Sequence, residues 1–118
     1  MSFVESLRRV TNNLKDSKGI ALVGMDGIVV EEHKKDPTLD LQSLGAEYSG
    51  MMREVQRTSA ALQMGDVREV SVLTDKVIVI SRQISKEYFI VLVVESEGNF
   101  GKGRFLIRRE IASLEKEL

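Results

Sequence analysis

The sequence predicts a single α+β domain in which helices cover both faces of a five-stranded antiparallel sheet. Three observations predict this fold class. A tight-turn dipeptide, Asp26-Gly27, joins two strand-like runs, a long amphipathic segment follows, and three more strand-like runs come after it. With a helix at each end, the order is helix, two strands, long helix, three strands and helix, which packs as a compact sandwich. A length of 118 residues suits one domain, so residues 1–118 are expected to fold as a unit.

The first predicted elements are a short amphipathic helix and a hairpin. One stripe of that helix is apolar and consists of Phe3, Leu7, Val10 and Leu14. Two strands follow, Gly19 to Met25 and Ile28 to Lys34, because Asp26-Gly27 between them readily takes the positive φ angles of a tight turn. The second strand ends in a charged run, residues 31–35, which is typical of an exposed sheet edge.

A long helix is predicted from Leu41 to Met64. Asp40 is placed to cap its N-terminus, and Gly65 ends it. Its apolar residues fall within an arc of roughly 100°, which predicts one face packed on the sheet. That face comprises Leu41, Leu44, Tyr48, Met51, Met52, Val55 and Leu62.

The opposite face of this helix carries small residues between two arginines, a pattern that permits close approach of another surface. It comprises Ala46, Gly50, Arg53, Arg57, Ala61 and Met64. Gly45 and Gly50 each destabilise a helix interior by about 1 kcal/mol relative to alanine, so tertiary packing or a local cause should accompany them. The face is either a dimer or partner contact, or an ordinary solvated surface.

Three strands are expected after the helix: Val67 to Thr74, Val77 to Ile84, and Glu87 to Val94. The last is unbroken apolar sequence and should be central in the sheet, whereas the first alternates with charge and belongs near an edge. A glycine-rich loop, Glu97 to Gly103, leads into the final helix. The buried stripe of that helix is expected to comprise Ile107, Ile111, Leu114 and Leu118.

Composition argues against several function classes. A net charge of −1 gives no electrostatic basis for binding a nucleic-acid backbone or an anionic membrane. The chain has no cysteine and one histidine, His33, so thiolate chemistry and histidine-rich metal sites are not expected. The apolar run from Gly19 to Val30 is too short to span a bilayer. We therefore expect a cytoplasmic protein without cofactor, metal or inserted membrane segment.

Catalytic motifs are not evident. The loop Gly98 to Gly103 lies between a strand and a helix, where phosphate-binding loops occur, but its spacing matches neither common glycine motif. A flexible loop followed by a helix start is the simpler interpretation. His33 reads as a surface residue of an edge strand, and no serine, threonine or lysine has a recognisable companion base. An enzyme is therefore not expected.

Three local signatures, in this order and spacing, resemble the Roadblock family, which includes dynein light chains and the bacterial gliding-motility regulator MglB. They are the hairpin Ala21 to Val30, the long helix beginning near Asp40, and the segment Asn99 to Arg104 before the last helix. The resemblance implies two helices on one sheet face and the long helix on the other. It also implies a homodimer that pairs the long helices and joins the sheets through the third strand, here Val67 to Thr74.

The resemblance further implies a non-enzymatic scaffold or regulator that binds a small Ras-like GTPase, with a GTPase-activating role as one possibility. Arg53 and Arg57 are expected to contribute surface complementarity rather than an arginine finger. Arg104, Arg108 and Arg109 form either a second docking patch or solvated charge. The expected partner or dimer interface comprises Ala46, Gly50, Arg53, Arg57, Ala61, Met64, Val67, Glu69, Ser71 and Leu73.

Two alternatives belong to other functional classes, since fold does not fix function. The same layout resembles profilin-like modules, which act as small-molecule sensors or structural adaptors. A sensor requires a cavity. The bulky residues of the last strand favour a filled core instead: Phe89, Ile90, Leu92 and Val94.

Overall fold

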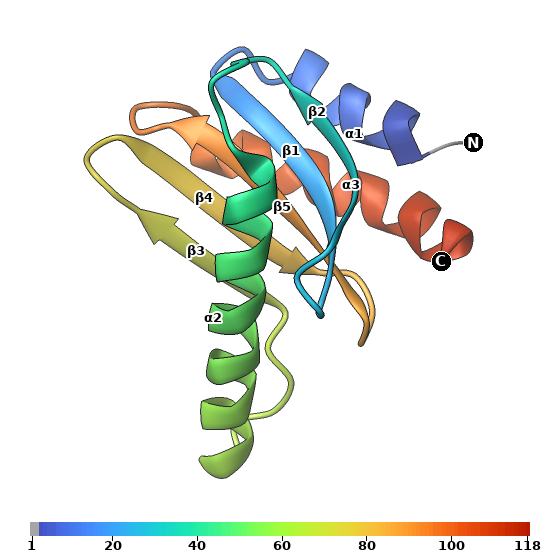
Figure 1. Cartoon of the computed structure of the whole chain (residues 1–118), viewed down its shortest axis with the longest axis vertical. Helices are drawn as coiled ribbons and strands as arrows, with labels where there is room; N and C mark the ends of the chain where they lie inside the picture. The colour runs from blue at the N-terminus through green and yellow to red at the C-terminus, as the bar shows by residue number, and fades with distance from the viewer. Residues whose placement is uncertain (1–2) are drawn as a thin grey trace.

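The structure is a computed structural model and describes residues 3–118. Its element order matches the predicted order of three helices and five strands (Figure 1). The elements are α1 (Phe3–Asn12), β1 (Ser17–Gly24), β2 (Val29–Lys34), α2 (Leu41–Ala61), β3 (Glu69–Leu73), β4 (Val77–Gln83), β5 (Tyr88–Glu95) and α3 (Phe100–Glu117).

The five strands form one antiparallel sheet in the order β2-β1-β5-β4-β3. The central position of β5 is confirmed, and so is the edge position of β3. The hairpin turn between β1 and β2 is confirmed as well. Gly27 has a φ of 91°, and the Ile28 amide donates to Asp26 Oδ1 at 3.1 Å.

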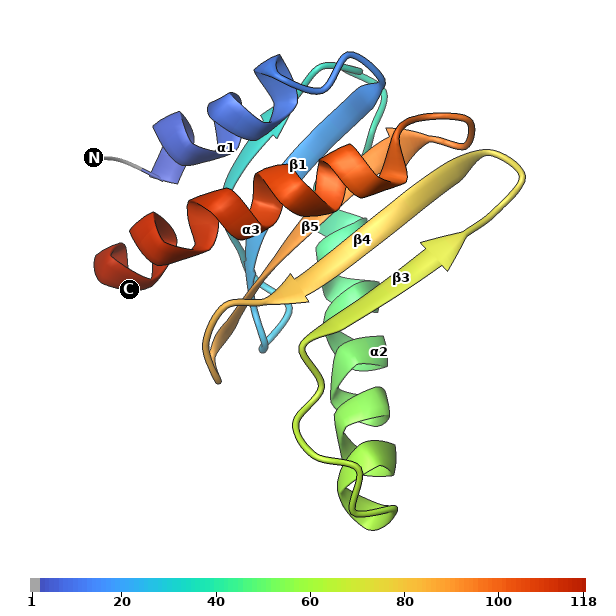
Figure 2. The same ribbon diagram turned by 180° about the vertical axis from the view of Figure 1, so that it is seen from behind.

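Helices α1 and α3 cover one face of the sheet, and α2 lies on the other, as Figures 1 and 2 show from opposite sides. Alternate residues of β5 supply the two cores. Ile90, Leu92 and Val94 pack toward α1 and α3, whereas Phe89, Val91 and Val93 pack toward α2. All six are at most 1% exposed. Full burial of such a side chain contributes about 1.5–3 kcal/mol, so β5 stabilises both cores substantially.

Helix α2 ends three residues before the predicted Met64. Its last helical residue is Ala61, and the chain turns out of the helix at Gln63, which has a φ of 54°. Gly65, with a φ of 92°, follows outside the helix. The left-handed conformation at Gln63 ends the helix before the glycine is reached.

The glycine-rich segment contains the start of α3, so the expectation of a flexible loop up to Gly103 is wrong. The helix begins at Phe100, and the Asn99 side chain caps it by accepting from the Lys102 amide at 2.9 Å. Gly103 is buried, and an added Cβ would lie 3.3 Å from both Ile80 and Leu92. Gly103 therefore permits close packing of the helix on the sheet.

The buried stripe of α3 differs from the predicted one. Ile107 and Leu114 are buried, but Leu118 is 42% exposed, and the stripe includes Leu106 and Glu110 instead. The helix lies beside α1 as well as on the sheet, which turns an additional face inward (Figure 2). Glu110 is 4% exposed and accepts from the Arg9 guanidinium, with Nη2 to Oε1 at 2.8 Å and Nε to Oε2 at 3.0 Å.

Among residues 3–118, no helix combines the length and the apolar character needed to cross a membrane.

Candidate functional site on the long helix and the third strand

The N-terminal half of α2 is anchored on the sheet. The Asp40 carboxylate accepts hydrogen bonds from the Ser43 amide at 3.1 Å and from the Ser43 hydroxyl at 2.7 Å. These bonds satisfy helix donors that have no partner within the helix. They also lower the pKa of Asp40. From this cap the helix runs mainly over β1 and β2.

Gly45 explains how closely α2 approaches the sheet. An added Cβ there would lie 3.0 Å from Val29 Cγ2 and 3.2 Å from Val23 Cγ1. Gly50 is different, since an added Cβ would meet only the tip of Arg53, at 3.8 Å. The two helix glycines therefore have different causes: Gly45 fits the sheet of its own chain, and no packing within residues 3–118 requires Gly50.

The C-terminal half of α2 extends beyond the sheet (Figures 1 and 2). The buried residues of α2 are Leu41, Gly45, Ser49 and Met52, so burial within the described chain stops at Met52. Val55 is half-buried and Leu62 is 63% exposed, although both belong to the predicted sheet-facing stripe. Met64, just past the helix, is 73% exposed. An apolar surface is thus left open where the helix overhangs the sheet.

Arg53 and Arg57 are exposed, but each guanidinium makes a contact with another residue of the same chain. Arg53 Nη1 donates to the Met25 carbonyl oxygen in the hairpin between β1 and β2. Arg57 pairs with Glu54, one turn earlier, with Nε to Oε2 at 3.2 Å. This pairing raises the pKa of Arg57 and lowers that of Glu54. Neither guanidinium extends freely from the helix as an arginine finger would.

The two alanines of the predicted small-residue row lie at different places along the helix. Ala46 lies over the hairpin turn, since an added Cβ at Gly27 would be 3.4 Å from the Ala46 Cα. Ala61 lies on the overhanging end of the helix and is exposed. The row therefore begins at the hairpin of its own chain and ends beyond the sheet.

Strand β3 forms an open edge, because it pairs with β4 on one side and has no strand on the other within residues 3–118. Its register with β4 places Glu69, Ser71 and Leu73 on the α3 side of the sheet. Leu73 is 71% exposed and Ser71 is also exposed. Val67 precedes the strand, which is shorter than the predicted Val67 to Thr74. The open main-chain groups of β3 can pair with another strand.

Glu69 is held by two arginines of its own chain. Arg104 Nε of α3 lies 2.7 Å from Glu69 Oε2, and Arg82 Nη1 of β4 lies 3.6 Å from Oε1. This network fixes the start of the edge strand relative to α3. Sequence spacing could not predict it, because the three residues are far apart along the chain.

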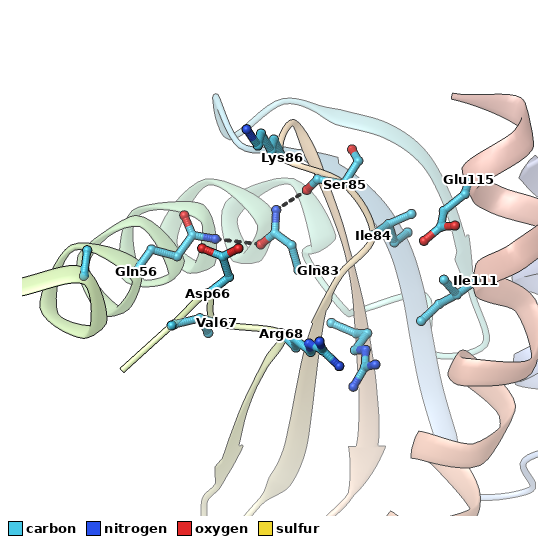
Figure 3. Close-up of a pocket in the computed structure, with 13 residues that line it drawn as sticks. Gln56, Asp66, Val67, Arg68, Gln83, Ile84, Ser85, Lys86, Ile111 and Glu115 are labelled. Atoms are coloured by element: carbon cyan, nitrogen blue, oxygen red, sulfur yellow. Dashed lines mark hydrogen bonds between the residues drawn. The ribbon is translucent and has the colours of Figure 1, made fainter. Parts of the chain in front are cut away.

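A cavity of about 730 Å³ lies beside the start of β3 (Figure 3). Helix α2 contributes Gln56, whose amide donates to Gln83 Oε1 at 2.8 Å, and α3 contributes Ile111 and Glu115. The cavity is open to solvent and peripheral, whereas the centre of the sheet is filled as the bulky residues of β5 predicted. The lining comprises Gln56, Ala60, Gly65, Asp66, Val67, Arg68, Arg82, Gln83, Ile84, Ser85, Lys86, Ile111 and Glu115.

The other sequence candidates do not converge on a chemical centre. His33 is half-buried in β2, opposite Ile20 of β1. Within residues 3–118, no group of three or more histidine, aspartate or glutamate side chains could hold a metal ion. The functional candidate is therefore a surface, formed by the overhanging end of α2 and the open edge of β3.

This architecture is that of a Roadblock/LC7 domain. A Roadblock/LC7 domain from Streptomyces avermitilis superimposes with a TM-score of 0.89 at 16% identity, over 99% of this chain and 98% of that one. An MglB solved in a tetrameric arrangement gives 0.85 at 16% identity, over 96% and 85%. At these identities the likeness concerns the fold.

Sequence similarity extends the assignment beyond the fold. MglC from Myxococcus xanthus is 36% identical over the full length of both chains, with a TM-score of 0.72. The chain therefore belongs to the Roadblock/LC7 family, together with MglC and MglB. No family model matches the chain, and no curated protein sequence matches it either.

Proposed function

We propose that this protein is a non-enzymatic homodimeric scaffold that binds and regulates a small Ras-like GTPase. One observation carries the proposal. Among residues 3–118, the apolar C-terminal end of α2 is exposed, β3 has no strand on its outer side, and the two segments are neighbours in sequence. Family membership is the reason for proposing a small GTPase as the partner, because Roadblock domains commonly serve as platforms for such proteins.

The dimer would form by antiparallel pairing of β3 with β3 of a second copy, with the two α2 helices alongside. Strand pairing satisfies the open main-chain groups and removes a sheet edge. Leu62 and Met64 are 63% and 73% exposed, and burying each fully would contribute about 1.5–3 kcal/mol. Gly50 and Ala61 leave room for close helix approach. A specific dimer of this kind should bury more than about 1,000 Å².

Regulation of hydrolysis by this chain would act through the GTPase's own residues. Arg53 and Arg57 contact Met25 and Glu54 of their own chain, and reaching a partner's active site would require both contacts to break. We therefore assign both a role in surface complementarity and in holding α2 on the hairpin.

The first test is capture of partners by the purified protein from a lysate of its source, once with GDP and once with a non-hydrolysable GTP analogue. Retention of a small GTPase with the analogue supports a regulator that reads the active state. Its hydrolysis rate is then measured with and without this protein and its Arg53→Ala and Arg57→Ala variants. If the two arginines are surface contacts, their replacement by alanine should weaken binding of the GTPase. Loss of an arginine finger would instead lower the rate of GTP hydrolysis by about 10³ or more. If no GTPase is retained with either nucleotide, the proposal fails.

A second candidate function is a small-molecule sensor, favoured only by the peripheral cavity. Its volume of about 730 Å³ lies within the usual range of ligand sites. Its open mouth and mixed polar lining fit a ligand less well than an enclosed apolar pocket would. A thermal-shift screen of small metabolites tests this function, and a hit that Gln56→Ala abolishes would support it.

A further inference from the structure

The N-terminal half of α3 concentrates positive charge. Residues 100–109 contain four basic side chains and no acidic one, although the whole chain has a net charge of −1. The acidic residues of α3 come later, at Glu110 and beyond. The four basic side chains are Lys102, Arg104, Arg108 and Arg109.

The carboxylates that could neutralise this charge are already engaged. Glu110 is 4% exposed and receives the Arg9 guanidinium, so it offers Arg109 only a longer contact, from Nε to Oε2 at 3.8 Å. Glu69 is bound by Arg104 at 2.7 Å. The side chains of Lys102 and Arg108 make no hydrogen bond or ion pair with the described residues, 3–118. The structure therefore leaves uncompensated cations on an exposed helix face.

Two exposed aromatic rings lie among these cations. Phe105 is 55% exposed, and the Arg109 guanidinium carbon lies 6.0 Å from the centre of its ring. Phe100 is 37% exposed, with the Arg104 guanidinium carbon 5.4 Å from its ring. Each ring is partly exposed beside a guanidinium, which gives an apolar contact next to a carboxylate-binding group. We call Phe100, Lys102, Arg104, Phe105, Arg108 and Arg109 the α3 basic surface.

The α3 basic surface lies on the opposite side of the sheet from α2, in the helical layer that α3 forms with α1 (Figure 2). Arg104 adjoins the candidate site described above through its ion pair with Glu69 of β3. Pairing of two copies through β3 and α2 would leave Phe105, Arg108 and Arg109, which come later in α3, accessible on each copy.

We propose that the α3 basic surface binds an acidic segment of a partner protein, with carboxylates on Arg108 and Arg109 and an apolar side chain on Phe105. Arginine binds carboxylates through two parallel hydrogen bonds, and exposed aromatic and arginine residues are the types that dominate interface energies. The acidic segment supplies both the missing counter-charges and a cover for the rings.

The small number of uncompensated charges argues against an anionic membrane or a nucleic acid as the partner. Stable attraction to an anionic membrane takes a cluster of about four to eight basic residues. Here Glu69 offsets Arg104 and Glu110 partly offsets Arg109, so Lys102 and Arg108 alone remain uncompensated. A nucleic-acid site would require a larger basic footprint than a chain of net charge −1 provides.

The test uses the full chain and a fluorescent amphipathic peptide with glutamates on one helical face and leucines on the next. Fluorescence anisotropy should show binding that weakens with added salt, and the same peptide with lysines for glutamates should not bind. Arg108→Glu/Arg109→Glu should weaken binding of the acidic peptide at least about tenfold and gain affinity for the lysine peptide. Phe105→Ala should weaken it several-fold without changing the salt dependence.

The matched control is Lys76→Glu/Lys86→Glu, which changes net charge equally at two exposed hairpin turns and should bind as the parent protein does. Circular dichroism checks the fold of each variant, and Arg108→Gln/Arg109→Gln replaces the reversal variant if that one does not fold. Failure of the acidic peptide to bind, or equal weakening by the control pair, overturns the proposal. So does binding to phosphatidylglycerol vesicles with no binding to the peptide. This test involves no GTPase, so its outcome is independent of the proposed function.

Discussion

Helices cover the two faces of the sheet to different extents. On the α1 and α3 side, two helices cover a core that includes Leu92 and Leu114, both fully buried. On the α2 side, one helix covers β1 and β2, and its buried stripe stops at Met52 while the helix continues to Ala61. The first face is completed by the chain itself. The second leaves the apolar C-terminal end of α2 exposed, close to the free edge of β3 among residues 3–118, and a second molecule can cover both.

Leu92→Ala should show the largest effect, because it opens a void in the completed face. Leu92 lies in the central strand and is fully buried. We expect the free energy of unfolding to fall by about 2–5 kcal/mol in urea denaturation. Leu73→Ala, at a 71% exposed edge position, serves as the control. A similar loss from both variants would contradict the contrast between the core and the open edge.

Arg9→Met should have the second largest effect, because the buried Glu110 carboxylate loses the Arg9 guanidinium that it binds. Arg9 links α1 to α3 through this pair, and the Glu110 side chain is 5% exposed. We expect a loss of about 2–3 kcal/mol, below the full value for a buried pair because the Arg9 side chain is 37% exposed. Thermal unfolding measures it. Restoration of stability in Arg9→Met/Glu110→Met would show that the unpaired charge is the cause, and no change in Arg9→Met alone would refute it.

Leu62→Glu tests whether the exposed end of α2 takes part in dimerisation, so the measured quantity is association rather than stability. The side chain is 63% exposed on the overhanging end of α2, so the monomer should tolerate glutamate. In the proposed dimer the charge would be buried, and we expect dimerisation to weaken at least about tenfold in sedimentation velocity. Lys76→Gln, at an exposed turn, lowers the net charge by the same single unit and is the control. Unchanged association in Leu62→Glu would remove the overhang from the interface.

The two helix glycines should respond to alanine in opposite directions. Gly50→Ala meets open space and should stabilise the monomer by about 0.5–1 kcal/mol through helix propensity. Gly45→Ala forces a methyl group to 3.0 Å from Val29 and should lower stability by a similar amount, about 1 kcal/mol. Chemical denaturation compares them. If Gly50→Ala also weakens dimerisation, helix contact at this position is supported; equal stability changes would refute the difference in packing.

The smallest effect is expected at the α2 cap. Asp40→Ala should lower the melting temperature by a few degrees, because the Ser43 amide loses its acceptor. The pKa of Asp40 is held below its ordinary value of 3.8, so the charged cap stabilises the fold above that pH and loses this effect as the pH falls through the lower, folded-state value. The melting difference between parent and variant should therefore shrink in acid. A difference that grows with acidity would contradict this role.

Local patterns determined the elements accurately where the cause of structure is local. Asp26-Gly27 specified a turn, Asp40 a cap, and the apolar run of β5 a central strand. The incorrect predictions concern the ends of helices, where competing local interactions decide at which residue the helix starts or stops. Asn99 starts α3 inside the glycine-rich segment, and the backbone at Gln63 ends α2 before Gly65.

The candidate surface was only partly predictable. The third strand and the long helix were identified from pattern and family resemblance, and their role as an interface stays a prediction. Leu62 was assigned to the sheet-facing stripe, because periodicity shows that a face is apolar but not how far the sheet beneath it extends. The docking role of Arg53 stays a prediction. Its contact with the Met25 carbonyl could not be predicted, because it joins segments distant in sequence.

The sequence by itself determined the order of elements, the central strand and the family, because these follow from short-range periodicity and from positions shared with relatives. Tertiary structure alone decided which charges are neutralised. Glu110 meets Arg9 and Glu69 meets Arg104 only when α1, α3 and β3 are brought together. The same packing leaves Arg108 and Phe105 uncovered and carries α2 past the sheet, because side-chain partners and exposed surfaces depend on how elements are placed in space rather than on their local sequence.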